Sequence, residues 1–192
     1  MGKDRLAAFS DGVIAILITI MVLELRLPHG ADWQALAAIA PSFLSYVLSF
    51  LYLAIYWNNH HHLLYTVTRV DGLILWANSH LLFWLSLVPA ATAWLGENLA
   101  VPLPTAVYGA VLLMPAVAYY LLQMAIVHGH GPNSVLAEAL GRDIKGKLSL
   151  LFYAAGIALA FFYPWASIAL YVVVALMWLI PDRRIERAVG KE

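Results

Sequence analysis

Six long apolar segments follow one another along the sequence, and they constrain the fold more than any other feature. They lie at about residues 4–25, 36–61, 71–95, 104–128, 145–163 and 165–181. A helix needs about 20 apolar residues to cross the hydrocarbon core of a bilayer. Since 63% of the 192 residues are hydrophobic and 11% are charged, these segments are too long and too many for a soluble core. We predict an all-α membrane protein, with six transmembrane helices forming a single domain over residues 1–192.

The lysines and arginines predict the orientation of these helices, because cytoplasmic loops retain an excess of positive charge. When six crossings are drawn, only Arg26 falls on one side of the membrane. The other side holds Lys3, Arg5, Arg69, Arg142, Lys145, Lys147, Arg183, Arg184, Arg187 and Lys191. Both termini are therefore expected in the cytoplasm. The longest loop runs from His128 to Lys147, and its residues 137–140 are expected to form a short interfacial turn.

One face of the first segment carries a stripe of residues at helical spacing. A helix turns by about 100° per residue, so five residues lie within about 40° of the direction of Ile16: Arg5, Phe9, Gly12, Ile20 and Leu23. Thr19 lies about 60° away from it. Ser10 and Asp11 point to two other sides of the helix. Such a stripe is often simple packing. Several copies of it around a rotation axis can instead enclose a pore, which requires a homo-oligomer.

Motifs in the first three segments add a more specific signal. The first segment begins Arg5-x-x-x-Phe9-Ser10-Asp11 and continues as an isoleucine-rich helix. Later segments contain Pro41-x-x-x-x-Tyr46-x-x-Ser49-Phe50, then Trp57-x-x-His60, then Asn78 and Pro89. In order and approximate spacing, these residues resemble the signature of the transmembrane protein 175 family, the non-classical potassium channels of endosomes, lysosomes and bacterial membranes. The motifs cover roughly the first 120 residues, and the remainder matches by hydropathy.

The resemblance implies an assembly and a pore. Prokaryotic members carry one six-helix unit and form tetramers, so this single-unit chain is expected to be a homotetramer in a prokaryotic plasma membrane. The first helix would line the pore, with Ile16 as a hydrophobic constriction, Thr19, Ile20 and Leu23 as further layers, and Gly12 on the same face. The expected partners are other copies of the chain, membrane lipid and permeant monovalent cations, chiefly potassium, and no nucleic acid.

A hydrophobic constriction differs from the usual potassium filter, in which carbonyl oxygens of a Thr-Val-Gly-Tyr-Gly loop replace the hydration shell of the ion. The sequence has no such loop. An isoleucine ring offers no oxygen ligands and can gate by dewetting, so we predict a potassium-preferring leak channel of modest selectivity. Thr19 could add hydroxyl oxygens near the constriction, or its hydroxyl could bond to a carbonyl of its own helix.

The polar residues beside the stripe are expected to hold the first helix in place. Ser10 and Asp11 need hydrogen-bond partners where water is scarce, and Trp57, His60 and Asn78 can supply them from the second and third segments. The resemblance places Arg5 and Phe9 in the same supporting network. Arg5 could find its partner within its own subunit or in a neighbouring one.

Other function classes predict different features. A secondary transporter or proton-coupled carrier would show repeats and interrupted helices, and an enzyme would need polar residues converging at one depth. A histidine-ligated cofactor would use His60, His61 or His62 with His80, His128 or His130, but adjacent histidines on a helix point about 100° apart and form no i, i+4 pair. The chain has no cysteine, which excludes thiolate metal sites and disulfides. We expect no enzyme activity, no metal site and no cofactor.

Overall fold

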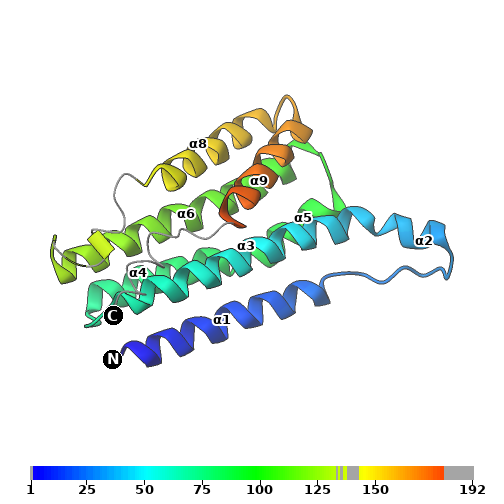
Figure 1. The fold of residues 1–192 in the computed structure, drawn as a ribbon. Helices are drawn as coiled ribbons and strands as arrows, with labels where there is room; N and C mark the ends of the chain where they lie inside the picture. The colour runs from blue at the N-terminus through cyan, green and yellow to red at the C-terminus, as the bar shows by residue number, and fades with distance from the viewer. Residues whose placement is uncertain (1, 133, 135, 138–142, 180–192) are drawn as a thin grey trace.

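The computed structural model describes residues 2–132, 134, 136–137 and 143–179, and these residues form an α-helical bundle without strands (Figure 1). The helices, in chain order, are α1 (Lys3–Leu23), α2 (Trp33–Ala38), α3 (Ala40–Tyr65), α4 (Gly72–Leu85), α5 (Val88–Glu97), α6 (Pro102–His130), α8 (Ile144–Leu159) and α9 (Pro164–Leu179). The prediction of an all-α protein is confirmed.

Four spans in the described part of the chain are long and apolar enough to cross a membrane. They are α1, α3, the pair α4 and α5 together (Gly72–Glu97), and α6. The fifth and sixth predicted crossings correspond to α8 and α9, which have 16 residues each and are therefore only about 24 Å long. Six crossings thus remain a prediction, whereas the prediction of several apolar helices long enough to span a membrane is confirmed.

Aspartates and prolines set the helix boundaries. The side chains of Asp32, Asp71 and Asp143 accept the N–H of the residue three positions on, at 2.7, 2.9 and 3.1 Å, and so cap α2, α4 and α8. Pro89 is the second residue of α5 and has no N–H to donate to the Leu85 carbonyl, which its ring also crowds. This favours a break before Pro89, although α6 continues through Pro115. The predicted segment at 71–95 is therefore two helices joined by a turn at Ser86 and Leu87.

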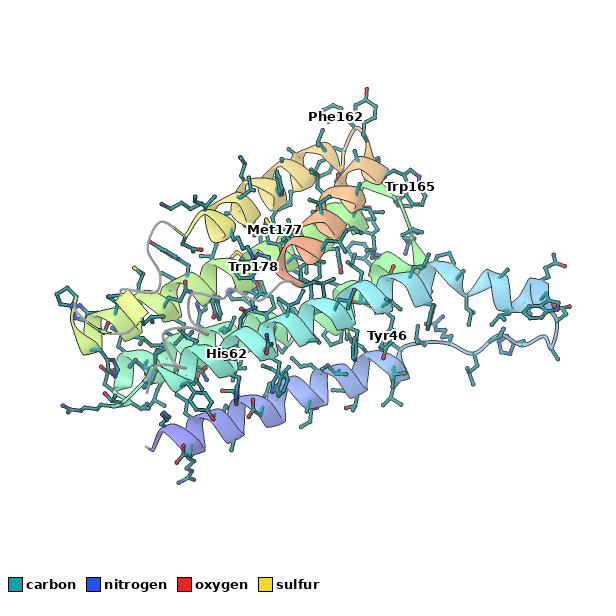
Figure 2. The ribbon with its side chains drawn as sticks, in the orientation of Figure 1. Tyr46, His62, Phe162, Trp165, Met177 and Trp178 are labelled. Carbon is teal, nitrogen blue, oxygen red and sulfur yellow. The ribbon has the colours of Figure 1, made fainter. Side chains whose placement is uncertain are left out.

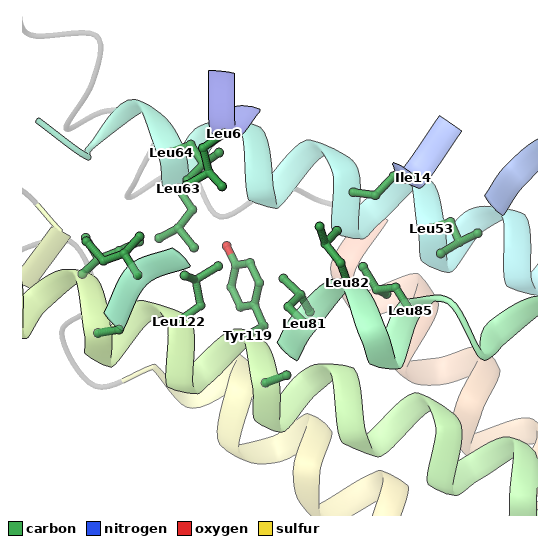
Figure 3. Close-up of a cluster of buried hydrophobic side chains, with 14 of the residues drawn as sticks. Leu6, Ile14, Leu53, Leu63, Leu64, Leu81, Leu82, Leu85, Tyr119 and Leu122 are labelled. Carbon is green, nitrogen blue, oxygen red and sulfur yellow. The ribbon is translucent and has the colours of Figure 1, made fainter. Parts of the chain in front are cut away.

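Two apolar clusters hold the bundle together. The first joins α1, α3, α4 and α6, and Figure 3 shows its leucines around Tyr119. The second joins α3, α5, α6, α8 and α9 around Tyr171. The hydroxyl of Tyr52 donates to the carbonyl of Tyr171 at 2.6 Å, and the Tyr171 hydroxyl donates to the carbonyl of Thr105 at 3.3 Å. α1 belongs to the first cluster alone, so it forms one edge of the bundle.

The two ends of the bundle differ in charge. The start of α1, the end of α3, the start of α4, the end of α6 and the start of α8 lie together at one end (Figure 1). The basic residues described there are Lys3, Arg5, Arg69, Lys145 and Lys147. At the opposite end Arg26 pairs with Glu97 at 3.2 Å, and Figure 2 shows Phe162 and Trp165 there. The described residues therefore keep the predicted separation of charge.

Some predicted features lie outside the described residues. They are the basic residues Arg142, Arg183, Arg184, Arg187 and Lys191, residues 138–140 of the expected interfacial turn, and the last two residues of the segment predicted at 165–181.

Candidate functional site

α1 has two faces with different surroundings. The buried face holds Leu6, Ser10, Ile14, Leu17 and Met21, spaced three or four residues apart. This face packs against α3, α4 and α5. The spacing is that of one side of an α-helix, so a single stripe attaches α1 to the rest of the chain.

The other face carries the predicted stripe, and its own chain leaves it uncovered. Phe9 is 56% exposed, Ile16 57%, Ile20 39% and Leu23 81%. Gly12 and Thr19 are exposed as well, and a Cβ added to Gly12 would meet no atom within 4 Å. Large apolar side chains and a glycine are therefore aligned along a face that the rest of the subunit leaves largely exposed.

Arg5 and Phe9 lie on this exposed face. The single chain does not bring them into the polar network that was predicted to hold α1. Arg5 has no hydrogen-bond or ion-pair partner among the described residues.

The Thr19 hydroxyl donates to the carbonyl of Ile16 at 2.8 Å. This is the back-bonded alternative expected for a threonine in a helix. The oxygen keeps acceptor capacity for another donor or for a cation.

Ser10, Asn78 and His60 form a hydrogen-bonded chain between α1, α4 and α3, and all three side chains are buried. The amide of Asn78 donates to Ser10 Oγ at 3.0 Å, and Ser10 Oγ donates to the Leu6 carbonyl at 2.9 Å. Asn78 Oδ1 lies 2.6 Å from His60 Nε2. Because the Asn78 amide nitrogen already faces Ser10, its oxygen must accept, and His60 carries its proton on Nε2.

Asp11 makes the second polar contact of α1. The indole Nε1 of Trp57, on α3, donates to Asp11 Oδ1 at 3.0 Å. Ser10 and Asp11 are adjacent in sequence but point to different sides of α1, so one meets α4 and the other meets α3. Together the two contacts fix α1 in rotation about its own axis.

A further polar cluster lies near the other end of α1, and we did not predict it from the sequence. Thr92 Oγ1, on α5, lies 2.6 Å from Ser49 Oγ, which lies 2.8 Å from the Tyr108 hydroxyl. Thr92 Oγ1 is also 4.0 Å from the sulfur of Met21, on the buried face of α1. Ser49 belongs to the motif quoted above, but no local pattern marks Thr92 and Tyr108 as its partners.

Two further histidines, His80 and His130, make hydrogen bonds that join parts of the fold. His80 accepts the indole N–H of Trp84 at 2.8 Å. His130 Nε2 accepts the backbone N–H of Thr68 at 3.0 Å and that of Arg69 at 3.2 Å, which ties the α3–α4 connection to the end of α6. In the described part of the chain, no group of three His, Asp or Glu side chains lies close enough to hold a metal ion.

Known proteins with similar sequences and structures agree on one family. A family model described as endosomal/lysosomal potassium channel TMEM175 matches residues 5–89. A potassium channel of Chryseobacterium sp. (strain P1-3) is 55% identical over 188 residues, covering 98% of each chain. A potassium channel of Streptomyces collinus is 35% identical over 187 residues, covering 92% of this chain and 91% of the relative.

A solved structure extends the similarity to three dimensions. It is the crystal structure of a lysosomal potassium-selective channel TMEM175 homolog from Chamaesiphon minutus. The two folds superpose with a TM-score of 0.82 at 28% sequence identity, over 94% of this chain and 97% of the other.

Proposed function

This chain belongs to the TMEM175 family, and on that premise we propose that it is a potassium channel whose permeation path is lined by the exposed face of α1. It acts as a channel and not as an enzyme. The observation that carries the proposal is the uncovered stripe of Phe9, Gly12, Ile16, Ile20 and Leu23.

α1 suits a permeation path in its length and attachment. Its 21 residues span about 31 Å, close to the thickness of the hydrocarbon core. Its polar groups Ser10 and Asp11 are bonded to α4 and α3, on sides away from the stripe. A helix held in this way presents the stripe in a fixed direction, which a narrow pore requires.

A closed pore requires several copies of α1, and we propose a homotetramer. Four stripes around a rotation axis would place four Ile16 side chains at one level as the constriction. Gly12 would widen the path one turn before Ile16, and Thr19, Ile20 and Leu23 would line it beyond. Native mass spectrometry of the purified protein should then show an assembly of four 21.2 kDa chains.

The chemistry of this lining predicts modest ion selectivity. Isoleucine side chains supply no oxygen ligands, so a cation passes with part of its water, and potassium gives up water more easily than sodium because it is the larger ion. Thr19 Oγ1 donates to Ile16, and its remaining acceptor capacity can face the ion. The proposed permeant ion is potassium, no resident metal or cofactor is involved, and flux is a leak that does not saturate as a carrier would.

We also propose the plasma membrane of a prokaryote as the location, with the basic end of the bundle in the cytoplasm. The described lysines and arginines at that end are Lys3, Arg5, Arg69, Lys145 and Lys147. The one basic residue described at the opposite end, Arg26, is paired with Glu97.

The test is ion flux from proteoliposomes under potassium or sodium gradients, for the wild type and for Ile16→Asn. Potassium should pass faster than sodium, and the asparagine ring should change the rate or the selectivity because it adds polar ligands at the constriction. Val22→Asn is the matched control, since Val22 is 47% exposed on the same helix but points about 120° away from Ile16.

Three results would contradict the proposal. They are the passage of neither ion through folded wild-type protein, flux that saturates with ion concentration, and equal effects of Ile16→Asn and Val22→Asn. Saturation would favour a carrier. Equal effects would remove Ile16 from the permeation path.

A further inference from the structure

A cavity of about 290 Å³ lies between α3, α6, α8 and α9. None of the described residues that line it belongs to α1, so it is separate from the proposed permeation path. Its volume falls at the lower end of the range for small-molecule sites. A second cavity, of about 90 Å³ and with a more polar lining, lies at the Arg26 end of the bundle.

Aromatic rings dominate the walls of this cavity. Six of the lining residues that the structure describes are aromatic: Tyr52, Tyr56, Tyr119, Tyr120, Tyr153 and Trp178. The Trp178 indole is oriented by a 2.8 Å hydrogen bond to Ser149 (Trp178 is labelled in Figure 2), and its ring already lies 5.9 Å from the ammonium of Lys145. The faces of such rings carry negative electrostatic potential and attract cations, alkyl-substituted ammonium ions in particular.

Two polar groups in the wall are available to a ligand. Gln123 is only 6% exposed, yet its side-chain amide has no hydrogen-bond partner among the described residues. The Tyr56 hydroxyl also lacks one, although its ring packs edge-on against Tyr119. Buried polar groups are normally hydrogen-bonded, so these two are suited to a molecule or water inside the cavity.

Among the described residues of the lining, the charged ones are Asp143 and Lys147, both at the start of α8. Asp143 caps α8 through the N–H of Gly146 and supplies a carboxylate at the edge of the aromatic wall. Lys147 is exposed and lies one helical turn further on. An incoming cation is attracted by Asp143 and repelled by Lys147 and by Lys145, whose ammonium lies over Trp178. Asp143 and Lys147 should therefore have opposite effects on the affinity of the cation.

We propose that this cavity binds a small organic cation, an ammonium ion bearing alkyl groups and an apolar body. The rings hold the alkylated head, Asp143 balances its charge, and the apolar remainder of the wall accepts the body. The proposal concerns binding alone and does not depend on which ion the protein conducts.

The test is binding of radiolabelled benzyltrimethylammonium to the full-length protein in lipid nanodiscs, with empty nanodiscs as the blank. Binding should saturate. Unlabelled benzyltrimethylammonium should displace the label at least about tenfold more effectively than neopentylbenzene, which has the same shape without the charge. Equal displacement, or no saturable binding, would overturn the proposal.

Variants locate the site. Tyr56→Leu removes a ring and should weaken binding about fivefold or more. Tyr56→Phe keeps the ring and removes only a hydroxyl to which benzyltrimethylammonium cannot hydrogen-bond, so it should change the affinity about twofold or less. Asp143→Asn keeps an oxygen to cap α8 but loses the charge, and should weaken binding about threefold or more. Lys147→Gln should strengthen it.

Asp71→Asn is the matched control for Asp143→Asn. Asp71 caps α4 in the same way but does not line the cavity. The Asp71→Asn variant should therefore bind benzyltrimethylammonium with unchanged affinity. If Tyr56→Leu does not fold, the affinity of Asp143→Asn and the comparison with neopentylbenzene still test the proposal. Unchanged affinity in Asp143→Asn and in any folded Tyr56→Leu would place the cation elsewhere and overturn the proposal.

Discussion

At the scale of single residues, the hydrogen bonds of α1 run in one direction. His60 Nε2–H donates to Asn78, Asn78 donates to Ser10, and Ser10 donates to the Leu6 carbonyl. Asn78 donates through its amide nitrogen and accepts through its amide oxygen, whereas Ser10 does both through its single hydroxyl. Asn78 is central because it alone contacts both of the other side chains in this chain of bonds.

Asn78→Leu should destabilise the folded protein by about 1 to 2 kcal/mol, because it leaves the His60 N–H and one acceptor site of Ser10 without partners in a buried site. The measurement is reversible unfolding of the detergent-solubilised protein with increasing denaturant. The same variant should also lower potassium flux, since the stripe of α1 would no longer be held in one orientation.

Asn58→Leu is the control for this change. Asn58 lies on α3 near His60, is partly buried, and has no hydrogen bond among the described residues, so the same substitution should change stability by about 0.5 kcal/mol or less. Equal destabilisation by the two substitutions would show that the hydrogen-bonded chain contributes nothing specific.

Much of the residue-level arrangement could be predicted from helical angles. Ser10 and Asp11 were expected to reach different neighbours, and the structure joins them to Asn78 and Trp57. The contacts of Thr92 and the two N–H groups bound by His130 could not be predicted, because they depend on which helix ends become neighbours. The pore-lining roles themselves remain predictions.

At the scale of helices, Gly12 and Gly109 differ in how much space surrounds them. Gly12 faces open space on α1. Gly109, on α6, is buried against the ring of Tyr171, and a Cβ there would lie 2.6 Å from Tyr171 Cζ and 2.9 Å from Ile157 Cγ1. The first glycine leaves room on an exposed face, whereas the second lets α6 approach α8 and α9.

Substitution of each glycine by alanine should separate packing from permeation. Gly109→Ala should destabilise the protein by about 1 to 3 kcal/mol through overpacking. Gly12→Ala should leave stability unchanged or raise it by up to about 1 kcal/mol, since alanine is the better helix former. Gly12→Ala should nevertheless reduce potassium flux, because four added methyl groups narrow the proposed path.

The measurements are the unfolding midpoint and the proteoliposome flux of both variants. Unaltered flux in well-folded Gly12→Ala protein would argue against a pore on this face of α1. Full stability of Gly109→Ala would mean that Tyr171 can move aside without cost.

Helix boundaries were only partly predictable from hydropathy. The apolar segment at 36–61 includes both the end of α2 and most of α3, because a hydropathy window does not register the short break at Ile39. Pro89 was visible in the sequence, but a proline does not by itself divide a helix, since α6 continues through Pro115. The break between α4 and α5 was therefore not predicted. The Asp32, Asp71 and Asp143 caps explain why three helices begin where they do.

At the scale of the whole molecule, the absence of cysteine permits a direct test of orientation. Thr68→Cys introduces a thiol in the exposed α3–α4 connection, and His29→Cys introduces one in the exposed α1–α2 connection. A membrane-impermeant thiol reagent added to intact cells should label His29→Cys alone, because the basic end is expected to face the cytoplasm.

Labelling of both variants after the membrane is permeabilised is the control for thiol accessibility. Selective labelling of Thr68→Cys in intact cells would reverse the proposed orientation. Labelling of both in intact cells would contradict the placement of the two connections on opposite sides of the membrane.

The overall class of the molecule could be predicted because the lengths of the apolar segments and the positions of the charged residues are properties of the sequence itself. The order in which the helices pack could not, since α1 contacts α3, α4 and α5 but takes no part in the cluster around Tyr171. The cavity beside α8 could not be predicted from the sequence either, because residues from four helices that are distant in sequence form it.

The uncovered stripe of α1 also has an evolutionary consequence. Ile16, Thr19 and Ile20 make no contribution to the apolar clusters of their own subunit, so the residues proposed to control permeation are distinct from those that fold the chain. Substitutions can therefore accumulate there one at a time without loss of the subunit fold. We expect related chains to differ at these positions, and therefore in conduction, more than they differ in architecture.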